Sequence, residues 1–319
     1  MNGLIIINKP PGITSYTVVK RVKKILKVRK AGHTGTLDPF AQGILVVCLN
    51  EGTKLVPFLV EEDKEYQAML RLGIETDTQD ITGRIINDNS PVHIASTQIG
   101  LAFKSFQGKI MQVPPMYSAL KYNGVPLYRL ARQGREIERA QREVEIKELS
   151  IVKIDSPRVF FRVVCSKGTY IRTLANDLGK YLGCGACLEM LNRTRSGNFQ
   201  FEDSVTLEKL EKTSLKEVED KWIISPSRAL SSLQEIAVDE EISRKLYQGK
   251  TISGAELKER NQTFLNLNGK IKILTPRGDL IAIAEATHHM ILDLEKPVWK
   301  LLRVFNRERQ EGSSDGKTG

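Results

Sequence analysis

One carboxylate lies in a short loop that also holds two glycines, a histidine and a proline. The loop spans residues 32–39 with the sequence GHTGTLDP, and the apolar run 43–49 after it is typical of a buried strand. The glycines let the backbone turn tightly or approach a ligand closely. Pro39 biases Asp38 toward extended geometry, which holds the carboxylate at the edge of the loop. Asp38 is therefore a candidate for chemistry beside a sheet, and capping of a turn is the alternative role for it.

An arginine far along the chain indicates a second charged position of interest. Arg172 falls in the first turn of a helix that is expected to begin after Gly168 and Thr169. A cation at that end of a helix opposes the helix dipole, which costs roughly a few tenths of a kcal/mol. We therefore expect an anion beside Arg172, either a carboxylate or a phosphate. An exposed side chain without a partner is the alternative.

Two pairs of residues have spacings that metal sites use. Asp77 and Asp80 precede a hairpin-like turn, and this context favours turn or cap duty over metal binding. Cys184 and Cys187 have CxxC spacing, but the chain has four cysteines in all and no second pair at the spacing of a zinc site. Four cysteines in 319 residues do not suggest a disulfide framework. Small buried thiols are favoured for the CxxC pair, and a redox pair is the alternative.

Apolar periodicity predicts the elements that must hold the loop. Residues 4–7 form an apolar strand, and Thr14 or Ser15 caps a helix with an inward apolar stripe and a basic outer face. Alternation with a period of two predicts strands over 66–73, 144–154 and 159–165. The helix that contains Arg172 has an apolar stripe made of Ile171, Leu174, Ala175, Leu178 and Leu182. These patterns by themselves predict an α+β fold.

The middle of the chain combines short elements with many basic residues. Residues 94–106 have the spacing of a short helix, whereas paired prolines make 113–121 irregular. Pro126 opens a helix over 127–133 that ends at Gly134. The basic side chains here are either a solvated face or a contact with an RNA backbone. They are Arg129, Arg132, Arg135, Arg139 and Arg142.

The last third of the chain has a different texture. Residues 191–197 are expected to form a basic turn, and 203–231 helical pieces joined by loops, with Pro226 at a boundary. Short alternating runs between glycines over 234–305 predict a small all-β module. The charged, glycine-rich stretch 307–319 has few apolar residues, so we expect a disordered tail there.

The composition favours a polyanionic partner. Lys plus Arg less Asp plus Glu gives 48 − 38 = +10, and the pI is about 9.3. Nucleic acid is the first candidate and an anionic membrane the second. A membrane span needs about 18 consecutive apolar residues, which the sequence lacks, and residues 1–15 contain no secretory signal, so we expect a cytoplasmic protein. At 319 residues, about two domains are expected.

Five ordered segments resemble the TruB family, the synthases that convert a uridine in the T loop of tRNA to pseudouridine. The stretch GHTGTLDPFAQGILVVCLNEGTK (32–54) is similar to the catalytic segment of that family. KPPG (9–12), TDTQD (76–80), VPPMYSALKYNG (113–124) and CSKGTYIRTLANDLG (165–179) resemble its other motifs. The sequence LNRT at 191–194 stands where the family usually has LRRT, and Cys187 stands where it more often has histidine.

The resemblance implies a pseudouridine synthase fold, with a central mixed, mainly antiparallel sheet. It implies a catalytic domain over 1–231 with an RNA-binding segment near 74–145, and a PUA-like RNA-binding β-barrel over 232–306. The implied substrate is uridine 55 in the T arm of tRNA, and the expected enzyme is a monomer without metal or cofactor. The implied catalytic residues are Asp38, Tyr66 and Arg172, and the implied substrate-binding residues are His33, Tyr170, Leu191 and Lys9.

The resemblance also assigns a role to each of these side chains. Asp38 is the nucleophile, acting at C1′ of the sugar or C6 of the base, and Arg172 pairs with it, holds it ionised and aims it. Tyr66 stacks on the flipped base and acts in the late removal of a proton from C5. Tyr170 and Leu191 form apolar walls.

Two further roles concern the surroundings of the loop. His33 fills the space that the base vacates, or else is a structural histidine that bonds its own loop. Lys9 supports the site from behind. Two alternatives to tRNA modification stay open for the function of the protein. It is the catalytic subunit of a guide-RNA complex, or it is a non-catalytic RNA-binding or chaperone protein.

Overall fold

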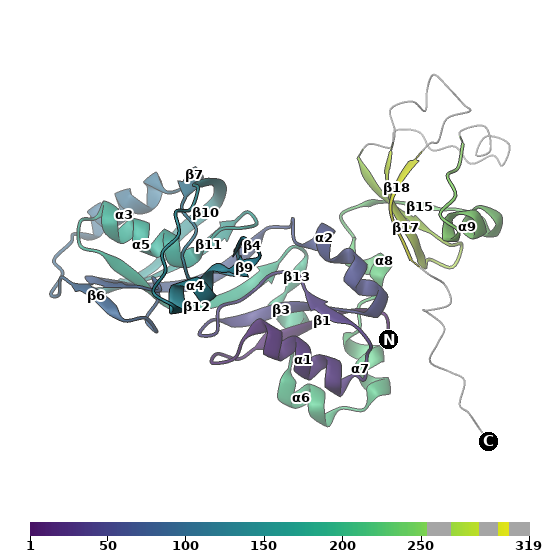
Figure 1. Cartoon of the computed structure of the whole chain (residues 1–319), viewed down its shortest axis with the longest axis horizontal. Coiled ribbons are helices and arrows are strands. Elements are labelled where there is room, and N and C mark those ends of the chain that lie inside the picture. Colours follow the sequence, from purple (N-terminus) through teal and green to yellow (C-terminus); the bar gives the residue numbers. More distant parts are fainter. Residues whose placement is uncertain (254–268, 287–298, 306–319) are drawn as a thin grey trace.

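A mixed, mainly antiparallel sheet forms the body of the protein (Figure 1). The structure is a computed structural model that describes residues 1–253, 269–286 and 299–305. The strands of this sheet are β1 (Gly3–Lys9), β2 (Ala31–His33), β3 (Gln42–Leu49), β4 (Lys64–Leu72), β7 (Gly108–Gln112), β10 (Arg142–Asp155), β11 (Arg158–Cys165), β12 (Ala186–Ser196), β13 (Phe199–Gln200) and β14 (Val205–Thr206). Their order is β14-β1-β3-β12-β4-β11-β10-β7, with β2 paired to β3 and β13 to β12. The β1–β14 and β3–β12 pairs are parallel and the other pairs are antiparallel, as predicted for the sheet.

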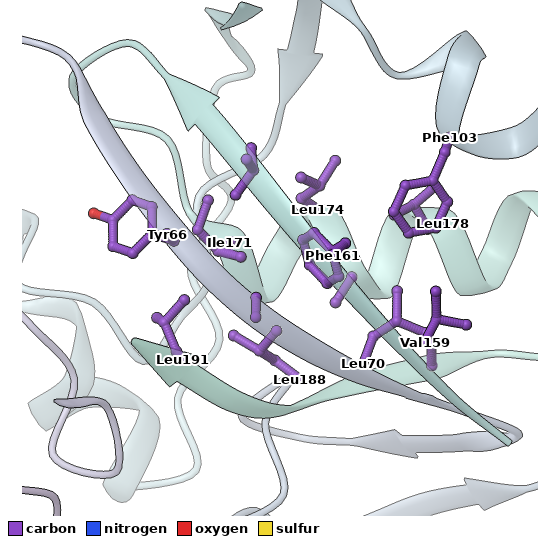
Figure 2. Close-up of a cluster of buried hydrophobic side chains, with 14 of the residues drawn as sticks. Tyr66, Leu70, Phe103, Val159, Phe161, Ile171, Leu174, Leu178, Leu188 and Leu191 are labelled. Carbon is purple, nitrogen blue, oxygen red and sulfur yellow. The ribbon is translucent and has the colours of Figure 1, made fainter. Parts of the chain in front are cut away.

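One face of β4 buries the core that lies next to the loop of Asp38. Alternate β4 residues face inward, as the period of two predicted, and they pack against Phe161 of β11 (Figure 2). Helix α5 (Ile171–Tyr181) closes this core with Leu174 and Leu178, and α3 (Ser96–Ser105) adds Phe103. The apolar stripe predicted for α5 is confirmed for Ile171, Leu174, Ala175 and Leu178, which are buried, whereas Leu182 follows the helix and is partly buried.

The N-terminal strand and helix form a second core. Helix α1 (Ser15–Ile25) begins after Thr14, whose side chain accepts a hydrogen bond from the backbone N–H of Thr17, as expected for a cap. Its inward valines pack on β1 and β3, together with α6 (Leu207–Lys212) and α7 (Leu215–Trp222). Together with α8 (Pro226–Ala229), these helices are the helical pieces predicted for 203–231. Between β3 and β4 lie a 3-10 turn (Asn50–Leu55) and α2 (Val56–Leu59), and a second 3-10 turn spans Phe201–Asp203.

Short elements project from the sheet over the segment 74–145. They are β5 (Ile74–Thr76), β6 (Ile85–Asp88), β8 (Lys121–Tyr122), β9 (Val125–Pro126) and α4 (Leu127–Arg132). The pairs β5–β6 and β8–β9 are antiparallel hairpins. The predicted helix after Pro126 is present, and the backbone N–H of Gly134 donates to the carbonyl of Ala131 just beyond its end.

The prediction of a basic turn over 191–197 is wrong. Residues 191–196 belong to β12, which pairs with β4 on one side and briefly with β3 on the other. Long-range pairing overrides the polar local sequence, because the arginines find partners within the sheet. Arg193 donates to main-chain carbonyls, and Arg195 lies 3.7 Å from a carboxylate oxygen of Glu65.

The C-terminal region contains a separate four-stranded sheet. Its strands are β15 (Gln234–Ala237), β16 (Lys270–Leu274), β17 (Leu280–Ala286) and β18 (Trp299–Val304), in that order. The expectation of an all-β module is wrong in one respect, since α9 (Glu240–Tyr247) lies between β15 and β16 and is capped by the carboxylate of Asp239. The barrel form stays a prediction. Residues 254–268 and 287–298 of the expected module and the expected disordered tail 307–319 lie outside the described residues.

The second sheet packs against the face of β1 that points away from α1. Leu280, Ile283 and Phe305 share an apolar cluster with Leu4 and Ile6 of β1. Figure 1 shows this sheet at the opposite end of the molecule from α3 and β6. It therefore lies away from the core in Figure 2. In the described part of the chain, no helix has the length and apolar character that a membrane crossing requires.

Gly43 of β3 lies directly against Arg193 of β12, so Gly43→Ala is expected to destabilise the fold. Its φ is +103°, and a Cβ there would lie 2.3 Å from the carbonyl oxygen of Arg193 and 2.7 Å from its nitrogen. Strain and overpacking together should lower the free energy of unfolding by at least about 2 kcal/mol. Urea denaturation followed by circular dichroism measures this change.

Gly100 is the matched control for this substitution. It lies in α3, and a Cβ there meets nothing within 4 Å. Gly100→Ala should therefore be neutral or stabilise by up to about 1 kcal/mol, since glycine weakens a helix interior. Equal urea midpoints for the two variants would contradict the prediction.

Candidate active site

Segments far apart in the sequence enclose a single cleft of about 1280 Å³. The loop of Asp38 forms one wall and the start of α1 lies beside it. The opposite side comes from the residues around Tyr117, the turn before α5 and the β5–β6 hairpin. Six of the seven predicted site residues line this cleft, namely His33, Asp38, Tyr66, Tyr170, Arg172 and Leu191. Lys9 lies behind the loop.

The expected partner of Arg172 is Asp38, and the ion pair is forked. Nε of Arg172 donates to Oδ2 of Asp38 at 2.8 Å, and Nη2 donates to Oδ1 at 3.2 Å. The guanidinium also donates to the carbonyls of Thr78 at 2.6 Å and Tyr117 at 2.7 Å. Its side chain is 3% exposed, whereas that of Asp38 is 28% exposed. Arg172 is thus fixed by four acceptor atoms, and it holds the carboxylate at the cleft surface.

The loop is anchored on both sides of Asp38. Before it, the hydroxyl of Ser15 donates to the carbonyl of Leu37 at 3.0 Å and accepts from its N–H at 2.8 Å. After it, Nζ of the fully buried Lys9 donates to the carbonyls of Ala41 at 2.6 Å and Pro39 at 3.2 Å. This geometry agrees with a supporting position for Lys9. Ser15 was expected only as a helix cap, so sequence reasoning missed its contact with the loop.

Burial and charge act against each other on Asp38. Burial raises the pKa of Asp38 above its ordinary value of 3.8, and this effect exceeds the opposing effect of the Arg172 guanidinium. Nearby Asp80 raises the pKa further, while Lys9 lowers it. The expectation that Arg172 holds Asp38 ionised therefore names one of two opposing effects on this pKa, and burial is the larger effect. A ligand that displaces water from the cleft strengthens the burial effect, so the ion pair with Arg172 becomes more important for keeping the carboxylate charged when the cleft is filled.

Asp80 is a member of the site that sequence reasoning missed. Its carboxylate accepts hydrogen bonds from the Thr78 hydroxyl at 2.9 Å and from the Thr82 N–H at 3.0 Å, in agreement with the expected turn duty. It also lies 3.7 Å from Nη1 of Arg172. The guanidinium therefore bridges two carboxylates. The spacing TDTQD was the available signal, but it predicts a turn and not a long-range partner.

Apolar and aromatic groups complete the walls of the cleft. Tyr66 is 8% exposed, and Figure 2 shows its ring near Ile171 and Leu191 with the hydroxyl directed away from the apolar cluster. Burial raises the pKa of the Tyr66 phenol. The guanidinium of Arg142 lies 4.9 Å from the ring centre of Tyr170, which stiffens that wall. The walls thus suit a flat ring, and the individual roles of these residues stay predictions.

His33 makes a hydrogen bond within its own loop. The N–H of Gly35 donates to Nδ1 of His33 at 3.3 Å, which is the structural alternative given above. Burial lowers the pKa of His33, and the charge of Arg193 lowers it further. A neutral imidazole fits both facts, because Nδ1 must be free to accept. The role of filling the space of a departed base stays a prediction.

Arg193 is the second residue that sequence reasoning missed. It is 2% exposed on β12 and lines the cleft opposite Tyr66 of β4. Nε donates to the carbonyl of Ile44 at 2.8 Å, and Nη2 to the carbonyl of Gly35 at 3.1 Å. Arg193 lay in the segment expected to be a turn. The similarity of LNRT to the family motif was the available signal, but it was used only for Leu191.

The cysteines are buried thiols. All four are free and buried, as favoured for the CxxC pair. Burial raises the pKa of Cys187 to about 11, so its thiol stays protonated near neutral pH. Across residues 1–253, 269–286 and 299–305, no three His, Cys, Asp or Glu side chains are grouped so as to hold a metal ion.

Family comparisons cover most of the chain. Residues 23–171 match the family model described as TruB family pseudouridylate synthase (N terminal domain). Residues 172–235 match the model described as tRNA pseudouridylate synthase B C-terminal domain. These ranges include Asp38, Tyr66, Arg172 and Leu191.

Individual relatives are similar along nearly their whole length. A Syntrophus aciditrophicus protein named tRNA pseudouridine synthase B is 44% identical over 310 residues, covering 96% of this chain and 99% of that one. A Clostridium acetobutylicum protein of the same name is 48% identical over 277 residues, covering 86% and 94%. Among solved structures, a Cbf5-Nop10-Gar1 complex matches with a TM-score of 0.73 and 28% identity over 96% of this chain and 86% of the other. An H/ACA RNP bound to a substrate RNA containing 2'-deoxyuridine matches with a TM-score of 0.71 and 26% identity, over 95% and 84%.

Proposed function

Because the chain belongs to the TruB family of pseudouridylate synthases, we propose that it isomerises uridine 55 in the T loop of tRNA to pseudouridine. The chain is a pseudouridine synthase, and its relatives named tRNA pseudouridine synthase B support tRNA as the substrate. The observation that carries the proposal is the forked Asp38–Arg172 pair, 2.8 Å at its shortest, at the surface of a cleft with aromatic and apolar walls.

The reaction breaks the N1–C1′ bond of uridine, turns the uracil ring and rejoins it through C5. A stacked uridine is out of reach of Asp38, so the nucleotide must be flipped into the cleft at a cost of about a few kcal/mol. Asp38 then acts as the nucleophile, at C1′ of the sugar or at C6 of the base. The isomerisation transfers no electrons to or from another molecule, and we propose that the enzyme uses neither a cofactor nor a metal.

The remaining side chains hold and surround the base. Arg172 aims the carboxylate, and Tyr170 and Leu191 form the walls on either side of the ring. Tyr66 stacks on the uracil and takes part in removal of the C5 proton. His33 fills the space that the flipped base leaves behind in the RNA, and Lys9 supports the loop from below.

The wider chain divides between catalysis and RNA binding. We propose a catalytic domain over 1–231, in which the segment near 74–145 binds the T arm, and a PUA-like RNA-binding domain over 232–306. The arginines of and beyond α4 support this assignment, because phosphate contacts dominate affinity for RNA. They include Arg132 and Arg142, which both line the cleft. We further propose that the enzyme acts as a cytoplasmic monomer.

A bare T-arm transcript tests the proposal directly. The purified chain alone should convert uridine 55, as detected by carbodiimide labelling and primer-extension stops, and its affinity should fall steeply as salt rises. Activity should persist in EDTA. Loss of activity in EDTA that zinc restores would contradict a metal-free reaction. Binding without any product would favour a non-catalytic RNA-binding or chaperone protein.

A guide-RNA complex is the second candidate function. The similarity to a Cbf5-Nop10-Gar1 complex, with a TM-score of 0.73, favours it. The identity to that chain is 28%, whereas relatives named tRNA pseudouridine synthase B reach 48%, which supports direct action on tRNA. Conversion of the transcript only after guide RNA and partner proteins are added would establish this second candidate.

A further inference from the structure

Arg193 carries a buried charge that has no acidic partner among the described residues. Its side chain is 2% exposed, and the ion pairs of the described ranges do not include it. A buried cation without an anion is unfavourable for the fold. Burial lowers the pKa of Lys9 and of Lys64, each to about 8, and the charge of Arg193 contributes to both shifts. Arg193 therefore adds positive charge at a buried place where no carboxylate among the described residues balances it.

Main-chain carbonyls hold the guanidinium in a fixed orientation. Nε donates to Ile44 on β3 at 2.8 Å, and Nη2 donates to Gly35 in the loop of Asp38 at 3.1 Å. Nη1 lies 3.4 Å from the position that a Cβ of Gly35 would occupy. The guanidinium thus fills the space beneath the loop, and it has little freedom to turn.

The cross-strand neighbour of this guanidinium is Tyr66. The two residues are direct partners in the β12–β4 register, so their side chains lie side by side on one face of the sheet. The positive charge of Arg193 lowers the pKa of the Tyr66 phenol. Both side chains line the cleft, and Figure 2 shows the hydroxyl directed away from the apolar cluster.

We propose that Arg193 is a positioning residue that holds its charge beside the Tyr66 phenol at the cleft and stabilises the negative charge on the phenol oxygen when the proton leaves. This inference rests on the proposed function. The proton passes from Tyr66 to N1 as the N1–C1′ bond breaks. After the ring has turned and the C5–C1′ bond has formed, the tyrosinate takes the proton from C5. The tyrosine ends unchanged, and C5 arrives where N1 had been, so one fixed group serves both steps.

The charges around Tyr66 agree with this role. Burial raises the pKa of its phenol, and Cys165 on β11 and Asp38 on the loop raise it further. The charge of Arg193 lowers it. Arg193 thus favours loss of the proton from the Tyr66 phenol. Without it, the phenol would hold its proton more tightly.

Titration of the phenol in the free protein tests the coupling without RNA. Trifluorotyrosine in place of Tyr66 ionises at lower pH than tyrosine, and its ¹⁹F resonance reports the charge. Arg193→Met should move this titration to higher pH, whereas Arg193→Lys should lie between the two. Arg195→Met is the matched control, since Arg195 lies on the same strand but bonds to Gly197 and faces Glu65. An unchanged titration in Arg193→Met would overturn the inference.

Kinetics on T-arm RNA separate positioning from simple anchoring. Arg193→Met should lower kcat about 10²-fold, the order of a proton-transfer contribution, with a much smaller change in KM. In a Tyr66→Phe background the same substitution should cause little further loss, because the hydroxyl is already absent. An equal loss in both backgrounds would show that Arg193 only anchors the loop, and would overturn the inference. If Arg193→Met does not fold, Arg193→Lys carries both measurements.

The two measurements also separate this inference from the proposed function. If the protein without substitutions forms no pseudouridine, the proposed function is contradicted, whatever the phenol titration shows. An active protein whose phenol does not respond to Arg193 contradicts the inference alone.

Discussion

Asp38→Asn is expected to form no detectable pseudouridine while binding T-arm RNA almost as tightly as the unchanged protein. An amide cannot serve as the nucleophile, so kcat should fall by roughly 10⁴-fold or more, the order found when a nucleophile is removed from other enzymes. Binding should survive because phosphate contacts, not the carboxylate, dominate affinity. Carbodiimide labelling with primer extension measures the product, and filter binding measures the affinity.

The fold should tolerate this substitution. The amide oxygen of the variant can still accept from Arg172, and Asp80 remains 3.7 Å from Nη1 of the same guanidinium. The substitution also removes a carboxylate whose ionisation is opposed by burial. The urea midpoint should therefore change little.

Asp63→Asn is the matched control for Asp38→Asn. Asp63 pairs with Lys147 at 2.7 Å on the surface, where solvent screens an ion pair and it contributes little to stability. This variant should keep full activity. If Asp38→Asn forms product at the rate of the unchanged protein, Asp38 is not the nucleophile.

Local patterns predicted the elements whose apolar spacing repeats within one segment. Helix α1 has a cap at Thr14 and an inward valine stripe, and β4 alternates inward and outward residues, so each is encoded within about ten neighbours. Helix α9 was missed although Asp239 and the following acidic residues are a start signal. This helix has only eight residues. The short alternating runs between glycines around it led to a prediction of strands instead.

Long-range pairing was beyond the reach of local patterns. Residues 191–196 are polar and basic, and they form a strand because β4 and β3 supply the hydrogen bonds. The same pairing buries Arg193 opposite Tyr66. No spacing within LNRTRS encodes that neighbour, so the role of Arg193 emerged only from the folded arrangement.

The active site was predicted in part by physics and in part by resemblance. The position of Arg172 at a helix start predicted a nearby anion, and the pair with Asp38, 134 residues away, confirms it. Only the family likeness named Asp38 as that partner. Ser15 and Asp80 show the remaining limit, because each satisfies a local cap or turn pattern and uses a further bond to hold the site. Local signals predicted the first contact of each and not the second.

Arg172→Met is expected to abolish activity and to destabilise the fold strongly. The substitution leaves Asp38 and Asp80 without their shared cation, and it removes the donors to two partly buried carbonyls. Removing one partner of a buried ion pair costs about 3–5 kcal/mol. Arg162→Met is the control, since Arg162 pairs with Glu65 and Glu148 where its side chain is 36% exposed. Loss of that surface pair should cost less than about 1 kcal/mol in urea unfolding.

The loss of stability should depend on pH with a definite sign. The folded-state pKa of Asp38 is already above 3.8, and removal of the guanidinium raises it further. The stabilisation that comes from a raised carboxyl pKa is present at low pH and is lost as pH rises through the folded pKa. The gap in unfolding free energy between Arg172→Met and the unchanged protein should therefore narrow as pH falls. A gap independent of pH would contradict the idea that Arg172 compensates an ionised Asp38.

Arg172→Lys extends the same argument to the reaction. Lysine keeps one charge but cannot fork onto both oxygens of Asp38 while also reaching Thr78 and Tyr117. The reaction needs ionised Asp38, so activity should fall as pH falls through the Asp38 pKa. Because that pKa rises when the fork is lost, the acid limb of kcat/KM should move to higher pH in this variant. An acid limb at the same pH as in the unchanged protein would mean that Arg172 aims the carboxylate without controlling its charge.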